Sequence, residues 1–347
     1  MLKVFTTVLP DVPYIPLLYP NFGTQERDSI LFLNNAFAGM EHPYVDVVDR
    51  VEDADCVLLA HNFPSLKRRS DFILEQAKLA ADRKKKFVIF WHGDLDAPVP
   101  FADAIVFRTS LYRFTRRQNE IAMPAYAEDL LGHDAVAIRP KHQGKPTVGF
   151  CGWARYKNVK NFLGTLTLNG LVRFGRFMGP EAILAHRKGL SFRKEAIAAL
   201  RRSKDVDCNF LLRTSYSGHS KTIRMDAEAA RREYRENLLG SDLALCVKGD
   251  GNYSYRFYEA LSLGRIPLLI DTQCVLPLED RIDYDSFILR VDYRDIGRLS
   301  EIVAEWWNRI TPEEFAAMQK RAREAFEKHL SVRAFLGEAM EIASHRL

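Results

Sequence analysis

The chain has 347 residues, of which 47% are hydrophobic and 27% are charged, and its formal net charge is +5. This composition is typical of a globular protein long enough for two domains, so it excludes disordered, collagen-like, coiled-coil and low-complexity classes. No apolar run approaches the roughly 18 residues that a membrane-spanning helix needs. The N-terminal apolar segment stops at Pro10, too early for a secretory signal.

The cysteines and the charge distribution narrow the possibilities further. The five cysteines are scattered, with no CxxC pair and no zinc-ligand spacing, which favours reduced thiols in a cytoplasmic protein. Residues 1–143 carry a net charge of −2 and residues 144–347 a net charge of +7, so an anionic ligand is expected in the second half. Basic residues do not alternate with aromatic ones along a stripe, and nucleic acid is therefore not an expected partner.

Strands alternate with helices in the first part of the chain, which is the pattern of an α/β unit with a parallel sheet. The patterns predict strands at 2–9, 54–60, 87–91 and 104–108, and helices at 26–37 and at 70–83, the latter with Ser70 as its N-cap. The polar, proline-bracketed segment 139–146 then separates two domains, 1–143 and 144–347.

The second domain repeats the alternation of strands and helices. Strands are predicted at 147–151, 209–212, 243–247 and 266–270, and helices at 191–202, 224–239, 253–263, 295–309 and 331–344. A further helix is expected to begin at Thr311-Pro312, because threonine is a good N-cap, proline suits the first helical position and Glu314 completes a capping box. Both domains therefore read as Rossmann-like units.

Residues 241–270 carry the clearest chemical pattern, in the order strand, glycine loop, helix, glycine stop and strand. Gly249 and Gly251 allow the backbone to approach a ligand closely. The helix that follows directs free N–H groups and the positive end of its dipole toward that ligand. A diphosphate suits this end of the helix best.

Two charged residues on this helix extend the pattern. Arg256 lies in the first turn and can make a two-pronged, charge-assisted contact with an anion. Glu259 follows three residues later on the same face, where it can accept hydrogen bonds from ribose hydroxyls. The alternative is that Arg256 and Glu259 form a local ion pair on an ordinary helix.

Residues 248–267 resemble the signature Ser-x-Arg-x-x-Glu-Ala-Leu-x-x-Gly-x-Ile-Pro of the exostosin-type glycosyltransferases. The positions that match are Ser254, Arg256, Glu259, Ala260, Leu261, Gly264, Ile266 and Pro267. A weaker resemblance extends over most of the chain, including the first strand with its Leu9-Pro10 ending and the Ala54-Asp55 element.

The resemblance implies a GT-B fold, an α/β architecture of two Rossmann-like domains that face a central cleft, with the last helices packing back on the N-terminal domain. It implies an inverting, metal-independent sugar transfer from a nucleotide diphosphate donor, UDP-linked rather than GDP-linked, to a glycan or glycolipid acceptor, with no cofactor. The residues expected to bind the donor are Lys248, Gly249, Gly251, Asn252, Ser254, Arg256 and Glu259. Arg155, Lys157 and Arg213 follow strand ends of the second domain and are either further phosphate contacts or ordinary surface residues.

An inverting transfer needs a general base for the acceptor hydroxyl. The family often has a His-Asp pair after a strand of the N-terminal domain, whereas this chain has His92-Gly93-Asp94 at the comparable place. Asp94 is the first candidate and His92 the second, because the carboxyl ends of parallel strands face the cleft. His61 is a third candidate, better suited to an acceptor contact. Alternatively, His92 and Asp94 only cap a helix or hold a loop.

Several other functions compete with this interpretation. A retaining enzyme would have a second glutamate near position 251, where this chain has Gly251. A manganese-dependent enzyme would use an Asp-x-Asp motif such as Asp94-Leu95-Asp96. A non-catalytic nucleotide-sugar-binding protein and a nucleotide-sugar epimerase with the same fold also stay open. Basic clusters favour peripheral contact with an anionic membrane surface on its cytoplasmic side.

Overall fold

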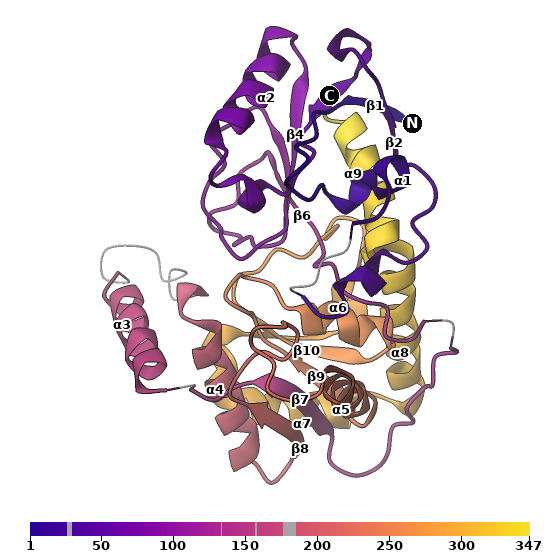
Figure 1. Cartoon of the computed structure of the whole chain (residues 1–347). Helices are drawn as coiled ribbons and strands as arrows, with labels where there is room; N and C mark the ends of the chain where they lie inside the picture. The colour runs from indigo at the N-terminus through magenta and orange to yellow at the C-terminus, as the bar shows by residue number, and fades with distance from the viewer. Residues whose placement is uncertain (26–29, 133, 157, 176–184) are drawn as a thin grey trace.

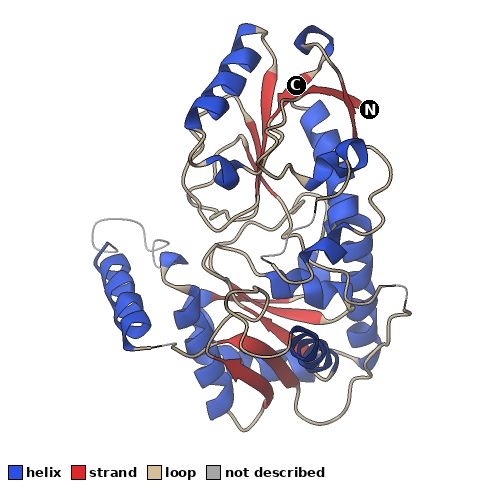
Figure 2. Cartoon of the chain, viewed as in Figure 1, coloured by secondary structure: helices blue, strands red, loops and turns tan. Residues whose placement is uncertain are grey.

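The computed structural model describes residues 1–25, 30–132, 134–156, 158–175 and 185–347, and they form two parallel α/β sheets that follow one another along the chain (Figure 1). The first sheet has the order β2-β1-β3-β4-β5-β6 and the second the order β11-β10-β9-β7-β8. Helices surround both sheets (Figure 2). The expected fold class, α/β with two Rossmann-like units, is confirmed.

The first sheet is built from short strands. They are β1 (Leu2–Phe5), β2 (Val45–Val47), β3 (Cys56–Leu58), β4 (Lys86–Trp91), β5 (Ile105–Arg108) and β6 (Glu120–Ala122). The helical elements between them are η1 (Pro16–Leu18), α1 (Tyr19–Phe22), η2 (Leu33–Phe37), η3 (Val51–Asp53), η4 (Phe63–Leu66) and α2 (Ser70–Asp82). Strands β3 and β5 are buried along their whole length, as expected for a parallel sheet covered on both faces.

The second sheet begins after the polar segment that was expected to separate the domains. Its strands are β7 (Thr147–Trp153), β8 (Asp207–Arg213), β9 (Leu243–Cys246), β10 (Ile266–Asp271) and β11 (Leu289–Asp292). The accompanying helices are α3 (Val159–Gly175), α4 (Gly189–Arg202), α5 (Ala227–Leu239), α6 (Tyr255–Ser262), η6 (Tyr284–Ser286), η7 (Tyr293–Arg298), α7 (Leu299–Arg309), α8 (Pro312–Ala325), η8 (Phe326–Leu330) and α9 (Val332–Ser344). The capping box of Thr311 and Glu314 at the start of α8 is present.

Some local predictions were wrong. The helix predicted over 26–37 is reduced to the 3-10 helix η2; residues 26–29 lie outside the described part, and Phe32 takes a left-handed φ of 61° that an α-helix cannot contain. Helix α2 starts one residue early, so its N-cap is Arg69 and not Ser70. The first strand ends at Phe5 instead of Leu9. Helix α3 and strands β2, β6 and β11 were not predicted.

The loops at the carboxyl ends of the two sheets meet. The backbone N–H of Gly251, after β9, donates to Asp94 Oδ1, after β4, at 3.2 Å. The N–H of Asn252 donates to Ser110 Oγ, after β5, at 2.9 Å. These contacts place the predicted donor-binding loop directly against the predicted catalytic loop of the other domain.

The chain also returns to the first domain at its C-terminal end. Helix α9, the yellow helix in Figure 1, runs along the first domain, and the rings of Phe335 and Phe107 lie 6.3 Å apart at their centroids. Arg346 donates a hydrogen bond to the carbonyl of Gln118 at 2.9 Å. The last helix therefore covers the first sheet as well as the second domain.

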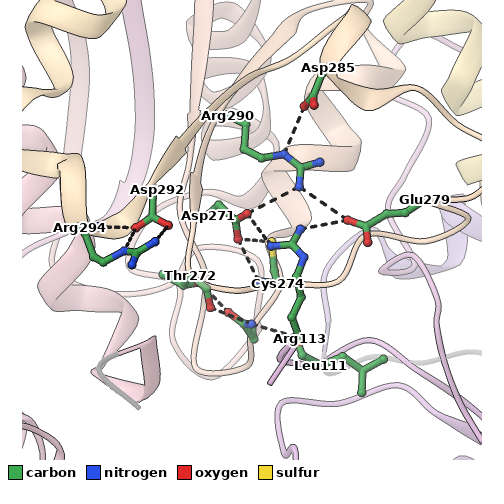
Figure 3. Close-up of polar contacts among 11 residues, drawn as sticks. Leu111, Arg113, Asp271, Thr272, Cys274, Glu279, Asp285, Arg290, Asp292 and Arg294 are labelled. Atoms are coloured by element: carbon green, nitrogen blue, oxygen red, sulfur yellow. Dashed lines mark hydrogen bonds and ion pairs between the residues drawn. The ribbon is translucent and has the colours of Figure 1, made fainter. Parts of the chain in front are cut away.

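A cluster of ion pairs joins the two domains at the carboxyl ends of β10 and β11 (Figure 3). Arg113, from the loop after β5, lies 2.7 Å from a carboxylate oxygen of Asp271 and 3.1 Å from one of Glu279. Arg290 approaches the same two carboxylates at 3.6 and 3.7 Å. Because Asp271 is buried, it depends on these guanidinium groups to compensate its charge.

Candidate functional site

The glycine loop between β9 and α6 is shaped by the other domain. The N–H of Gly249 donates to the carbonyl of Tyr253 at 2.9 Å and closes the loop. A Cβ atom at Gly251 would lie 2.7 Å from the Cα of Asp94, so only glycine fits where the two loops meet. Gly251 is therefore required by the contact between domains, a reason that the sequence could not supply.

Asn252 holds the loop in place. Its side-chain amide donates to the carbonyls of Leu111 and Thr272 at 2.8 and 3.2 Å, and its carbonyl oxygen accepts from Thr272 Oγ1 at 2.6 Å. The residue is 1% exposed. These contacts explain why an asparagine follows Gly251 without any appeal to a ligand. Ser254 is the N-cap of α6, and its side chain makes no capping hydrogen bond.

Arg256 lies beneath the start of α6, against the strand end of β7. Its guanidinium carbon lies 4.1 Å from the centroid of the Phe150 ring, and its Nη2 donates to the carbonyl of Cys151. A Cβ atom at Gly152, whose φ is +155°, would lie 2.9 Å from that Nη2. The buried Nε of Arg256 has no hydrogen-bond partner among the described residues. Gly152 thus makes room for Arg256 at the edge of the sheet.

Glu259 is paired with a tyrosine instead of Arg256. Tyr234 of α5 donates its hydroxyl to Glu259 Oε2 at 2.5 Å. Among the described ion pairs there is none between Arg256 and Glu259, so the alternative of a local ion pair does not describe this helix. Burial raises the pKa of the Glu259 carboxyl, although the Tyr234 hydrogen bond and the Arg256 charge act in the opposite direction.

A second arginine, which the sequence analysis missed, lies beside Arg256. Arg193 of α4 donates to the carbonyls of Trp153 and Lys248 at 3.1 and 2.9 Å. Burial, followed by repulsion from Arg256, lowers the pKa of Arg193 to about 10. Two buried guanidinium groups that repel one another at the carboxyl ends of β7 and β9 favour a bound anion, which would offset both charges.

Tyr216 connects these groups to the first domain. Burial raises the pKa of its hydroxyl, and the charges of Glu259, Arg256, Asp94 and Arg193 all act on it. The residue nevertheless keeps 44% of its surface exposed. The tyrosine therefore lies where the two arginines, the glutamate and the candidate base come together and where the site opens to solvent.

Lys248 is buried at the domain boundary. Its Nζ donates to Tyr112 Oη and to the carbonyl of Ala185, both at 2.7 Å. Burial lowers its pKa to about 7. The nearby Asp96 lies 3.6 Å from His186 Nδ1. Lys248 thus ties the second domain to the first through its hydrogen bond to Tyr112.

Asp94 and His92 both face the glycine loop. Asp94 is exposed, accepts the hydrogen bond from Gly251, and is close enough to Tyr253 to hydrogen-bond its side chain. The His92 ring stacks on Tyr126 at a centroid distance of 4.1 Å, and its Nε2 lies 3.2 Å from both the Tyr126 N–H and Tyr255 Oη. Asp94 is therefore the more accessible of the two candidate bases.

The third histidine candidate is fully buried and both of its nitrogens are engaged. His61 Nε2 accepts from the N–H of Leu9 at 2.8 Å, and Nδ1 lies 3.1 Å from the carbonyl of Pro13. With Nε2 as acceptor, Nδ1 carries the proton. Burial lowers the pKa of His61, so the neutral ring supports the N-terminal loop.

The remaining basic candidates lie at the edge of the site. Arg155 is exposed, and Lys157 lies outside the described residues. Arg213, at the end of β8, donates to Glu233 at 2.8 Å and to Ser217 at 2.6 Å. Neither Arg155 nor Arg213 approaches the Arg193–Arg256 pair in a described contact. Within the described residues, no three His, Cys, Asp or Glu side chains are grouped as metal ligands would be.

Comparison with known proteins finds a family match in the second half of the chain. The family model of the Exostosin GT47 domain matches residues 185–306, which contain Arg193, the glycine loop, Arg256 and Glu259. Residues 185–306 are therefore similar to an exostosin GT47 domain. The resemblance seen in the glycine-loop signature is confirmed.

Curated relatives each match over part of the chain. Exostosin-1 of Drosophila melanogaster is 30% identical over 121 residues, 35% of this chain and 15% of that protein. The Exostosin-1 homolog of Caenorhabditis elegans is 28% identical over 125 residues, 36% of this chain and 32% of that protein. A probable glucuronosyltransferase of Oryza sativa subsp. japonica is 37% identical over 70 residues, 20% of this chain and 16% of that protein. The chain thus matches less than a third of each relative.

Solved structures align over longer stretches at lower identity. Anabaena Alr3699/HepE in complex with UDP aligns over 100% of both chains with a TM-score of 0.41 and 10% identity. The spinosyn rhamnosyltransferase SpnG, complexed with thymidine diphosphate, aligns over 98% of this chain and 100% of its own, with a TM-score of 0.34 and 11% identity.

Proposed function

We propose that the protein is an inverting glycosyltransferase that moves a sugar from a nucleotide diphosphate donor, UDP-linked in preference to GDP-linked, to a hydroxyl of a glycan or glycolipid. The observation that carries this proposal is the Arg193–Arg256 pair. The two guanidinium groups repel one another, and a bound anion would offset both charges. Both arginines lie beside a glycine loop and a helix N-terminus, where anions bind well. The match to the Exostosin GT47 domain covers the segment that contains both arginines and supports the proposal.

The donor would lie with its diphosphate against Arg193 and Arg256. Glu259 is held by the Tyr234 hydroxyl and would accept hydrogen bonds from the ribose. The departing diphosphate gains negative charge in the transition state, and fixed guanidinium groups stabilise that charge without having to reorganise. The chain's own cations would thereby replace a metal ion in the reaction.

Asp94 would act as the general base. Asp94 is exposed at the carboxyl end of β4, opposite the donor loop, and its charge acts on the Tyr216 hydroxyl together with those of the two arginines. Asp94 takes the proton of the acceptor hydroxyl as that oxygen bonds to the anomeric carbon, and the bond from that carbon to the diphosphate breaks on the opposite face. His92, stacked on Tyr126, holds the second position as base.

The test is a donor screen followed by turnover. A ligand at about 100 times its dissociation constant stabilises the folded state by about 2.7 kcal/mol. If the site prefers UDP, UDP-linked sugars should therefore raise the melting temperature more than GDP-linked sugars at the same concentration. The best donor should then be consumed only slowly until an acceptor glycan is added. Binding without any turnover would indicate a non-catalytic binding protein, and isomerisation of the donor without acceptor would indicate an epimerase.

Location and membrane contact are part of the same proposal. None of the helices that the structure describes is long and apolar enough to cross a bilayer. Nucleotide sugars and a lipid-linked acceptor would meet where the protein rests on the cytoplasmic face of a membrane. The basic second half of the chain, with its net charge of +7, supports contact with an anionic surface.

A further inference from the structure

Helix α3 (Val159–Gly175) stands away from both sheets, as Figures 1 and 2 show. Its described hydrogen bonds to the rest of the domain come from Asn169, which donates to Ser191 Oγ at 2.6 Å and accepts from the N–H of Lys188 at 3.1 Å. These hydrogen bonds attach α3 beside the start of α4, while several of its apolar side chains stay exposed.

The outward face of α3 is apolar. Val159, Phe162, Leu163, Leu166 and Phe174 are exposed by 71%, 39%, 54%, 49% and 65%. Their spacing of three, one, three and eight residues places them along one stripe of an α-helix. In a helix of a globular domain such a stripe normally faces the core, and an exposed stripe of this size marks an interaction surface.

The charged residues in α3 and next to it in the sequence are all of one sign. The charged residues between 151 and 176 are Arg155, Lys157, Lys160, Arg173 and Arg176, and no acidic residue occurs between 135 and 180. Arg155 and Lys160 are exposed at the N-terminal end of the helix. An apolar stripe between basic ends is complementary to a surface that is apolar inside and negatively charged outside.

We propose that α3 is an interfacial helix that docks the protein on an anionic lipid bilayer, with its apolar stripe at the boundary between headgroups and acyl chains. A second copy of the chain fits less well, since an antiparallel pair of α3 helices would bring the basic ends together. The helix has 17 residues and contains Lys160 and Arg173, so it lies in the interface and does not span it. The surface that binds lipid is independent of the donor site.

The test is sedimentation of the full chain with vesicles of phosphatidylcholine alone or mixed with phosphatidylglycerol. The wild type should bind the mixed vesicles, and added salt should weaken that binding. Leu163→Gln with Leu166→Gln should reduce the partition coefficient at least about tenfold, and Lys160→Glu about fivefold or more. Leu74→Gln is the matched control, because Leu74 is 55% exposed on α2 in the other domain.

Three outcomes would overturn the proposal. They are no binding of the wild type to phosphatidylglycerol vesicles, equal loss in the Leu74 control, and undiminished binding of the double leucine variant. Light scattering after gel filtration tests whether a second copy of the chain binds the stripe instead. A dimer of the wild type that is lost in the double leucine variant would assign the stripe to a second copy. Circular dichroism and nucleotide binding should be unchanged in all variants, since none of the altered residues belongs to the donor site.

Discussion

Replacing Arg256 by alanine should weaken nucleotide binding and leave the protein folded. A hydrogen bond between charged groups contributes about 1.5–3 kcal/mol, so loss of the guanidinium should raise the dissociation constant of UDP roughly 10- to 150-fold. The dissociation constant of Arg256→Lys should lie between those of the wild type and Arg256→Ala, because lysine keeps the charge but loses the planar fork. Isothermal titration calorimetry with UDP measures the effect directly.

The structural cost of this change can be separated from the binding effect. Arg256 also covers the Phe150 ring and donates to the Cys151 carbonyl, so Arg256→Ala should lower the free energy of unfolding by about 1–3 kcal/mol, less the repulsion from Arg193 that it relieves. Arg201→Ala is the matched control, since its guanidinium lies 5.7 Å from the Phe210 ring on the same domain, outside the site. Unchanged UDP affinity in a folded Arg256→Ala protein would refute the anion site.

Further predictions concern the base, the metal, the buried lysine and the contact between domains. Asp94→Asn should lower turnover about 10²–10⁴-fold and leave UDP affinity unchanged; a changed affinity would make Asp94 a binding residue. Turnover should survive EDTA, and recovery with manganese after its loss would contradict the metal-free mechanism. Burial lowers the pKa of Lys248 from 10.5 to about 7, so between these values the unfolded chain binds the extra proton and stability rises with pH. Urea unfolding should show that the free energy of unfolding of the wild type rises on the order of 2 kcal/mol from roughly pH 7 to roughly pH 9. Lys248→Met should lack this rise, and an equal rise in both proteins would contradict a lowered pKa of Lys248. Arg113→Ala should lower the free energy of unfolding by about 1–2 kcal/mol, because Arg290, at 3.6 Å, is then the remaining described guanidinium partner of buried Asp271. An unchanged thermal melt would show that the Arg113–Asp271 pair contributes nothing to stability.

The sequence predicted the part of the site that one segment encodes. Strand β9, the glycine loop, α6 and β10 follow directly from the order of apolar runs and glycines, and Arg256 and Glu259 were placed on the correct helix. Their actual partners could not be read from that segment. Cys151, Tyr234 and Arg193 lie on other elements, and only folding brings them to the end of the sheet. The loop contact that requires Gly251 likewise comes from the other domain.

The local errors have similar causes. The apolar residues at 30, 31, 33 and 37 suggested a helix, but η2 and the left-handed Phe32 show that this segment follows the packing around it instead of its own periodicity. Helix α3 was missed because the helix contains several glycines and threonines, which are weak helix formers. Its apolar pattern was nevertheless visible and could have indicated a helix with an exposed stripe.

A crystal structure of the protein with UDP would show directly whether the donor diphosphate binds at the Arg193–Arg256 pair. We expect the diphosphate to lie between Arg193 and Arg256, with N···O distances of about 2.7–2.9 Å as in other charge-assisted hydrogen bonds. The ribose hydroxyls should lie beside Glu259. A diphosphate bound elsewhere, for example at Arg155 and Arg213 with the Arg193–Arg256 pair empty, would contradict it.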